Sequence, residues 1–111
     1  MLNREELIKK VKTYNRFFNP ETLSKAYTFA LNAHKNQTRD SGDPYLTHPV
    51  EVANILTELK LDSATIATGL LHDTIEDTKA TYKIVEKEFG KEVADLVEGV
   101  TKISELEGKI I

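Results

Sequence analysis

A chain of 111 residues has the length of one small domain, and its net charge of −3 does not favour binding to a nucleic-acid backbone. With 40% hydrophobic and 30% charged residues, the composition is typical of a globular protein in water. The absence of cysteine excludes a disulfide scaffold and any thiolate metal site. No apolar run reaches the roughly 18 residues of a membrane span, and the first residues do not resemble a signal peptide. We therefore expect a cytoplasmic protein with no nucleic-acid and no membrane partner.

Hydrophobic residues recur at helical spacing along almost the whole chain. Asn3 followed by Glu6 has the pattern of a capping box and predicts a first helix over residues 4–16. Asn19 followed by Pro20 predicts the start of a second helix, over residues 20–37. Four further helices are predicted at residues 49–60, 63–73, 82–89 and 91–106. No stretch alternates apolar and polar residues as a β-strand does. We therefore expect an all-α helical bundle formed by one domain.

A loop is expected over residues 38–48, because Ser41, Gly42 and Pro44 interrupt the helical pattern there. At about ten residues it is longer than most connections in a compact domain, which makes it a candidate for function. The other end of the chain carries Ile110 and Ile111, an apolar terminus without a cap. This ending predicts a bundle that is incomplete on its C-terminal side and that self-associates through an exposed apolar surface.

The three histidines have different predicted surroundings. His34 lies on the inner stripe of the second helix, where a core histidine with satisfied hydrogen bonds is the simpler interpretation. His48 stands just before Pro49, where a helix start needs a cap and histidine is a poor one. His72 follows an apolar segment directly and precedes Asp73. The last two are therefore the candidates for chemistry.

His72 belongs to the segment LLHDTIEDT, which places Asp73, Glu76 and Asp77 within six residues of the chain. Burying such acids unpaired costs on the order of several kcal/mol each, and a divalent cation removes that cost. Imidazole and carboxylate ligands together suit Mn²⁺, Fe²⁺ or Zn²⁺. The alternative is a solvated helix end whose acids cap the next helix. Composition and spacing leave both interpretations open.

Three blocks of the sequence resemble the N-terminal hydrolase domain of the RelA/SpoT homologues, the enzymes of (p)ppGpp metabolism. They are RDSGDPYLTHP at residues 39–49, LLHDTIEDT at 70–78 and FGKEVADLVEGVTKIS at 89–104. The resemblance extends from about residue 26 to residue 104. His48 and the adjacent pair His72 and Asp73 also resemble the HD superfamily of metal-dependent phosphohydrolases. The resemblance thus implies an HD-domain helical bundle.

The activity that this resemblance implies is hydrolysis of the 3′-pyrophosphate of the guanine nucleotide alarmones ppGpp and pppGpp. The products are GDP or GTP and pyrophosphate, and the implied cofactor is Mn²⁺. By resemblance, His48, His72 and Asp73 fall on metal ligands. Glu76 and Asp77 fall on the catalytic acids that position and activate the attacking water.

On the substrate side, Arg39 matches a residue that packs against the guanine ring, and Ser41 lies in the same loop. The alternative for Arg39 is a solvated loop charge. The family's fourth metal ligand, an aspartate on a later helix, matches no residue here, so we expect weak metal binding and little or no hydrolysis by this chain alone. A non-catalytic helical interaction or nucleotide-binding module is the alternative function. The RDSGDPY block argues against an HD hydrolase of another nucleotide.

Overall fold

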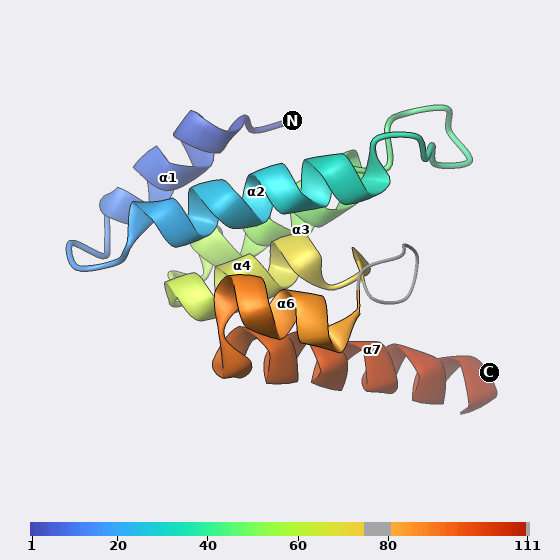
Figure 1. Cartoon of the computed structure of the whole chain (residues 1–111). Coiled ribbons are helices and arrows are strands. Elements are labelled where there is room, and N and C mark those ends of the chain that lie inside the picture. The colour runs from blue at the N-terminus through green and yellow to red at the C-terminus, as the bar shows by residue number, and fades with distance from the viewer. Residues whose placement is uncertain (75–80, 111) are drawn as a thin grey trace.

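Every regular element that the structure describes is a helix, and Thr38 and Pro44 form one isolated bridge (Figure 1). The structure is a computed structural model that describes residues 1–74 and 81–110, with residues 103–110 described by their backbone alone. The helices are α1 (Arg4–Lys12), α2 (Pro20–His34), α3 (Thr47–Glu58), α4 (Ser63–Leu71), α6 (Tyr82–Phe89) and α7 (Lys91–Ile110). The predicted all-α fold class is confirmed.

Side-chain caps begin the first two helices, as the sequence predicts. Asn3 accepts a hydrogen bond from the backbone N–H of Glu6, and the Glu6 carboxylate accepts one from the N–H of Asn3. Asn19 accepts from the N–H of Glu21. These contacts satisfy N–H groups that have no partner inside a helix, which fixes where each helix begins.

The ends of the first two helices come earlier than the sequence indicates. Helix α1 stops before residue 16 because the Thr13 hydroxyl donates to the carbonyl of Lys10, and the chain turns there. Helix α2 stops before residue 37 because the N–H of Gln37 turns back to the carbonyl of His34. Hydrophobic periodicity continues past both points, so it overestimates the length of both helices.

Apart from the end of α3, which comes at Glu58 instead of residue 60, three other boundaries differ from the prediction. Helix α3 begins at Thr47, two residues early, and α4 ends at Leu71, which leaves His72 as its C-cap. Helix α7 continues to Ile110, beyond the predicted end at residue 106, because no proline or turn motif interrupts its backbone. The first two differences affect the site, because they place His48 inside a helix and His72 at the end of one.

Helix α4 lies at the centre of the bundle, packed against α2, α3 and α7. Figure 1 shows α1 and α7 on opposite sides of it. The six consecutive residues from Ile66 to Leu71 are all buried. A helix that is buried on every side has little freedom to shift, so the residues that follow it are held in place.

Gly69 permits a close approach between α4 and α3. A Cβ atom added at Gly69 would lie 2.7 Å from Cδ1 of Leu56 and 3.6 Å from Cα of Ala53, both on α3. Even an added methyl group therefore forces the Leu56 side chain to move, and it would already be in contact with the α3 backbone. This contact sets the spacing between the last turn of α4, which precedes His72, and the middle of α3.

Asp62 caps α4 and gives a pH-dependent contribution to stability. Its carboxylate accepts from the N–H of Thr65 at 2.8 Å, and hydrogen bonds from the hydroxyl and the backbone of Thr65 lower the pKa of Asp62. Because the folded-state pKa is the lower one, this contribution is complete above the unfolded-state pKa of about 3.9 and is lost as the pH falls below it.

We expect Asp62→Ala to lower the free energy of unfolding at pH 7 by about 1 kcal/mol, since a helix cap is lost. Asp62→Asn keeps a capping oxygen but does not titrate. Urea denaturation of the wild type and Asp62→Asn at several pH values is the test. The difference in stability between the two should shrink as the pH falls from 5 to 3, and a constant difference would contradict the linkage.

Candidate metal centre

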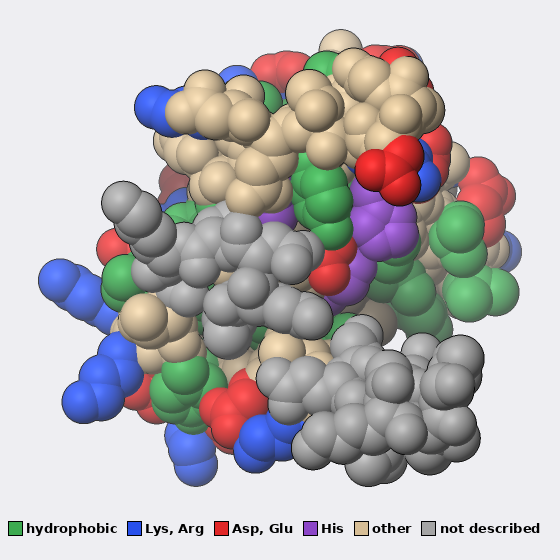
Figure 2. Space-filling view, turned by 90° about the vertical axis from the view of Figure 1, so that its right-hand side faces the viewer, with side chains coloured by type: hydrophobic (Ala, Val, Ile, Leu, Met, Phe, Trp, Pro, Cys, Tyr) green, Lys and Arg blue, Asp and Glu red, His purple; other side chains and the backbone are tan. Residues whose placement is uncertain are grey.

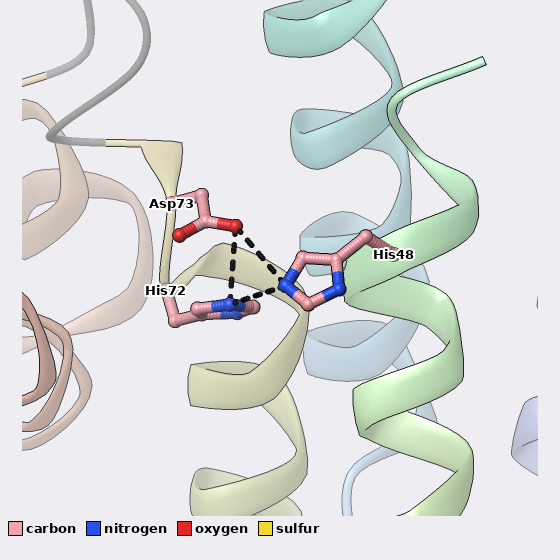
Figure 3. A group of neighbouring side chains, drawn as sticks. All are labelled: His48, His72 and Asp73. Carbon is pink, nitrogen blue, oxygen red and sulfur yellow. Dashed lines mark hydrogen bonds and ion pairs between the residues drawn. The ribbon is translucent and has the colours of Figure 1, made fainter. Parts of the chain in front are cut away.

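The side chains of His48, His72 and Asp73 point toward one another (Figure 3). His48 comes from the first turn of α3, and the other two residues directly follow α4. Nε2 of His72 lies 3.3 Å from Nε2 of His48 and 3.1 Å from Oδ2 of Asp73. Nε2 of His48 lies 3.5 Å from the same oxygen. The three atoms form a nearly equilateral triangle, which we call the ligand triangle.

The size of the ligand triangle fits a first-row divalent cation. Two ligand atoms bound to one ion at about 2.1–2.2 Å lie about 3.0–3.1 Å apart at a right angle and about 3.4–3.6 Å apart at the tetrahedral angle. The measured separations of 3.1, 3.3 and 3.5 Å fall in this range. The two nitrogen atoms and one oxygen atom are also the donor set that such metals accept.

The ring of His72 is fixed in the orientation that a metal ligand requires. Its Nδ1 lies 2.6 Å from the carbonyl oxygen of Gly69, which only accepts hydrogen bonds, so Nδ1 carries the proton. In the neutral ring, Nε2 then has a lone pair directed toward Oδ2 of Asp73. Two acceptors at 3.1 Å repel each other unless a proton or a metal ion lies between them. Such a hydrogen bond behind a metal-binding histidine is common in metalloproteins.

Asp73 supplies the negative charge of the ligand triangle. Its side chain is 14% exposed. Burial acts to raise the pKa of this carboxyl group, but His72 and His48 in their protonated, charged forms outweigh burial and lower it, His72 by donating from Nε2, and the hydroxyl of Tyr45 lowers it further. The group is therefore ionised at neutral pH. The hydroxyl of Tyr45 donates to Oδ2 of Asp73 at 2.9 Å.

The position of His48 differs from the prediction that it stands just before a helix. The backbone N–H groups of Thr47 and His48 donate to the carbonyls of Pro44 and Tyr45, so the helix starts on loop carbonyls without a side-chain cap. His48 need not act as a cap, and its ring is directed to the ligand triangle. Its side chain is 37% exposed, and histidine atoms are visible from solvent in Figure 2.

The two predicted substrate residues lie in the loop over residues 38–48. The guanidinium of Arg39 lies 3.5 Å from the carboxylate of Glu51, one turn after His48 on α3. The Ser41 hydroxyl donates to the carboxylate of Asp43 at 3.2 Å. Neither contact involves the ligand triangle, so the roles of Arg39 and Ser41 in binding a substrate stay predictions. The predicted catalytic acids, Glu76 and Asp77, lie outside the described residues.

The structure changes the interpretation of two residues, His34 and Tyr45. His34 is buried, and its Nδ1 lies 2.8 Å from Oε1 of Gln37, but its Nε2 has no hydrogen-bond partner within the described part of the chain. The interpretation as a satisfied core histidine therefore holds for one ring nitrogen only. Tyr45, which contacts Asp73, was not singled out from the sequence. The available signal was its place in the block at residues 39–49, three residues before His48.

The family model described as the HD domain matches residues 26–109 of this chain. This match covers most of the chain and includes all three residues of the ligand triangle. The chain therefore belongs to the HD domain family.

Similar proteins indicate which members of the HD domain family this chain resembles. The chain is 50% identical over 107 residues to the GTP pyrophosphokinase rsh of Brucella melitensis. It is 53% identical over 102 residues to the bifunctional (p)ppGpp synthase/hydrolase SpoT of Escherichia coli, and equally to the guanosine-3′,5′-bis(diphosphate) 3′-pyrophosphohydrolase of Shigella flexneri. These matches cover 96%, 92% and 92% of this chain, which spans about 14% of the length of each relative.

A solved structure agrees with these relatives. It is described as a metazoan ortholog of SpoT that hydrolyzes ppGpp, and it superposes with a TM-score of 0.71 at 33% identity. The match covers 76% of this chain and 49% of that one. The resemblance to the HD domain of the RelA/SpoT homologues is confirmed.

Proposed function

We propose that this chain is a metal-dependent hydrolase domain that removes the 3′-pyrophosphate of ppGpp or pppGpp. The products are GDP or GTP and pyrophosphate. The observation that supports this most directly is the ligand triangle, because a cation-sized set of donors is the central requirement of the reaction. The names of the SpoT-like relatives support the substrate.

Manganese is the metal that we propose, held by His48, His72 and Asp73. When bound, a divalent ion supplies a Lewis acid for the phosphoryl oxygens and lowers the pKa of a bound water. The protein contributes an ionised carboxylate and a histidine whose tautomer is set by the carbonyl of Gly69. Three protein ligands leave coordination positions for water and substrate, as catalytic metal sites require.

The remaining roles in this proposal come from the family resemblance. Glu76 and Asp77 would orient the attacking water and accept its proton. Arg39 would stack on the guanine ring, and Ser41 would contact the nucleotide from the same loop. The side chain of Arg39 is 38% exposed, so its ion pair with Glu51 costs little to exchange for a ligand.

The test of this function is release of pyrophosphate and GDP from ppGpp in the presence of MnCl₂. Because the family's fourth metal ligand matches no residue here, we expect release to be slow. What release there is should depend on Mn²⁺, stop on chelation and fall by about 100-fold or more in His72→Ala, because loss of a direct metal ligand should cost at least as much as loss of a hydrogen-bond partner of a ligand. Lys91→Ala, a change at an exposed side chain of α7, should leave the rate unchanged. Both products should be measured by chromatography.

Two results would contradict this proposal, one concerning the activity and the other the metal centre. Binding of Mn²⁺ without any release of pyrophosphate would favour the alternative of a non-catalytic nucleotide-binding or interaction module. Release that is equally fast in His72→Ala would contradict the assigned metal centre.

Self-association and the cytoplasmic location stay predictions. Leu96 on α7 is 41% exposed and lies toward the end of the chain where we expect association, while the side chains of residues 103–110 are outside the description. Among the described residues, no helix is both long enough and apolar enough to cross a membrane.

A further inference from the structure

Tyr45 connects the ligand triangle to a buried part of the fold. Its hydroxyl donates to Oδ2 of Asp73 at 2.9 Å, although the two residues are 28 positions apart in the chain. The hydroxyl thus contacts the same oxygen atom that lies nearest Nε2 of His48 and Nε2 of His72. Tyr45 is therefore hydrogen-bonded to Oδ2 of Asp73, the one atom of the ligand triangle that carries negative charge.

The ring of Tyr45 is held from behind by His34. The ring centroids lie 4.7 Å apart with an angle of 31° between the planes. His34 is 1% exposed, and its Nδ1 contacts Oε1 of Gln37. The backbone of Gln37 also accepts the N–H of Tyr45 at 2.9 Å. His34 at the end of α2 thus holds the ring of this tyrosine, and Gln37, three residues further on, holds its backbone.

The ring of Tyr45 also makes an edge-to-face contact with His48. The centroids of Tyr45 and His48 lie 6.2 Å apart at an angle of 73°. The ring of Tyr45 thus contacts both the buried His34 and the partly exposed His48, while its hydroxyl donates to Asp73.

A carboxylate needs such a partner to present one particular oxygen. The final torsion of an aspartate side chain is broad, so its two oxygens exchange readily unless a contact selects one of them. An oxygen atom of a carboxylate has two lone pairs, so it accepts a hydrogen bond and still has one pair for a metal. The Tyr45 hydroxyl occupies one of these pairs on Oδ2.

We propose that Tyr45 is a positioning residue that holds Oδ2 of Asp73 toward the two histidine nitrogens, and that His34 and Gln37 hold Tyr45 in turn. The inference rests on the proposed function, because it concerns the same metal centre. Hydrogen-bond partners of ligands contribute about 10- to 100-fold to metal affinity in other proteins. Tyr45 would contribute in the same way although it does not touch the metal.

The test compares Mn²⁺ binding in two tyrosine variants by isothermal titration calorimetry. Tyr45→Phe keeps the ring against His34 and removes only the hydroxyl. We expect its Kd for Mn²⁺ to rise about 10- to 100-fold. The matched control is Tyr14→Phe, which loses a hydroxyl that donates to the carbonyl of Leu61 at 2.7 Å, away from the site. Its Kd should equal that of the wild type.

Crystal structures of the metal-free wild type and Tyr45→Phe provide a readout that does not need the metal. We expect the Asp73 carboxylate to leave its orientation toward His48 and His72 in the variant. An unchanged orientation would overturn the inference, whatever the affinity. Absence of Mn²⁺ binding by the wild type would instead count against the proposed function, and the orientation of Asp73 would still decide the role of Tyr45.

Discussion

Asp73→Asn is expected to abolish the stabilisation of this protein by Mn²⁺. The substitution keeps the size of the side chain and an acceptor for Tyr45 but removes the only anionic member of the ligand triangle. At a Mn²⁺ concentration of about 100 times the Kd, the wild type gains about 2.7 kcal/mol. For a domain of this size, that gain corresponds to a rise in Tm of about 10–20 °C. A Kd raised about 100-fold leaves Asp73→Asn a gain of only about 0.4 kcal/mol.

The control for this experiment is Asp95→Asn. Asp95 also accepts a hydrogen bond from a tyrosine hydroxyl, that of Tyr82 at 2.6 Å, but it lies exposed on α7. The chemical change is the same, and the Mn²⁺-dependent rise in Tm should be that of the wild type. Thermal denaturation with and without MnCl₂ measures both variants. A full Mn²⁺ effect in Asp73→Asn would show that the ligand triangle is not the binding site.

Leu70→Ala is expected to cause a large loss of stability. Leu70 is fully buried in α4, which packs against α2, α3 and α7. Truncating a leucine in such a position removes buried apolar surface and leaves a cavity, at a cost of about 2–5 kcal/mol. This is a large part of the 5–15 kcal/mol of stability that is typical of a domain.

Urea denaturation followed by circular dichroism measures this loss. Ile55→Ala serves as the control, because Ile55 on α3 is 58% exposed and its truncation should cost less than about 0.5 kcal/mol. Equal losses in the two variants would mean that α4 is not the centre of the core in solution.

The sequence predicted the parts of this fold that depend on local interactions. The capping residues Asn3 and Asn19 form their hydrogen bonds within three positions of the chain, so their patterns were sufficient. The convergence of His48 with His72 and Asp73 was expected from motif and family resemblance, since spacing alone left a solvated helix end open. The structure adds the distances that make a metal centre chemically reasonable.

The features that the sequence did not predict depend on tertiary contacts. Helix α3 starts on the carbonyls of Pro44 and Tyr45, and no residue type marks such a start. The hydrogen bond from Tyr45 to Asp73 joins residues 28 positions apart, and the stacking of His34 on Tyr45 depends on the path of the loop between them. These contacts need the packed bundle before they form, so neither periodicity nor local propensity indicates them.

The helix start at Thr47 also affects how metal binding and local motion are coupled. A cation shared by His48 and His72 would act as a reversible cross-link across 24 positions of the chain. Such a link lowers the entropy of any state in which the two helix ends separate. The amides of Thr47 and His48 bond to loop carbonyls and lack a side-chain cap, so their hydrogen bonds depend on the position of the loop. We therefore expect the metal to slow hydrogen exchange at the start of α3 more than at its far end.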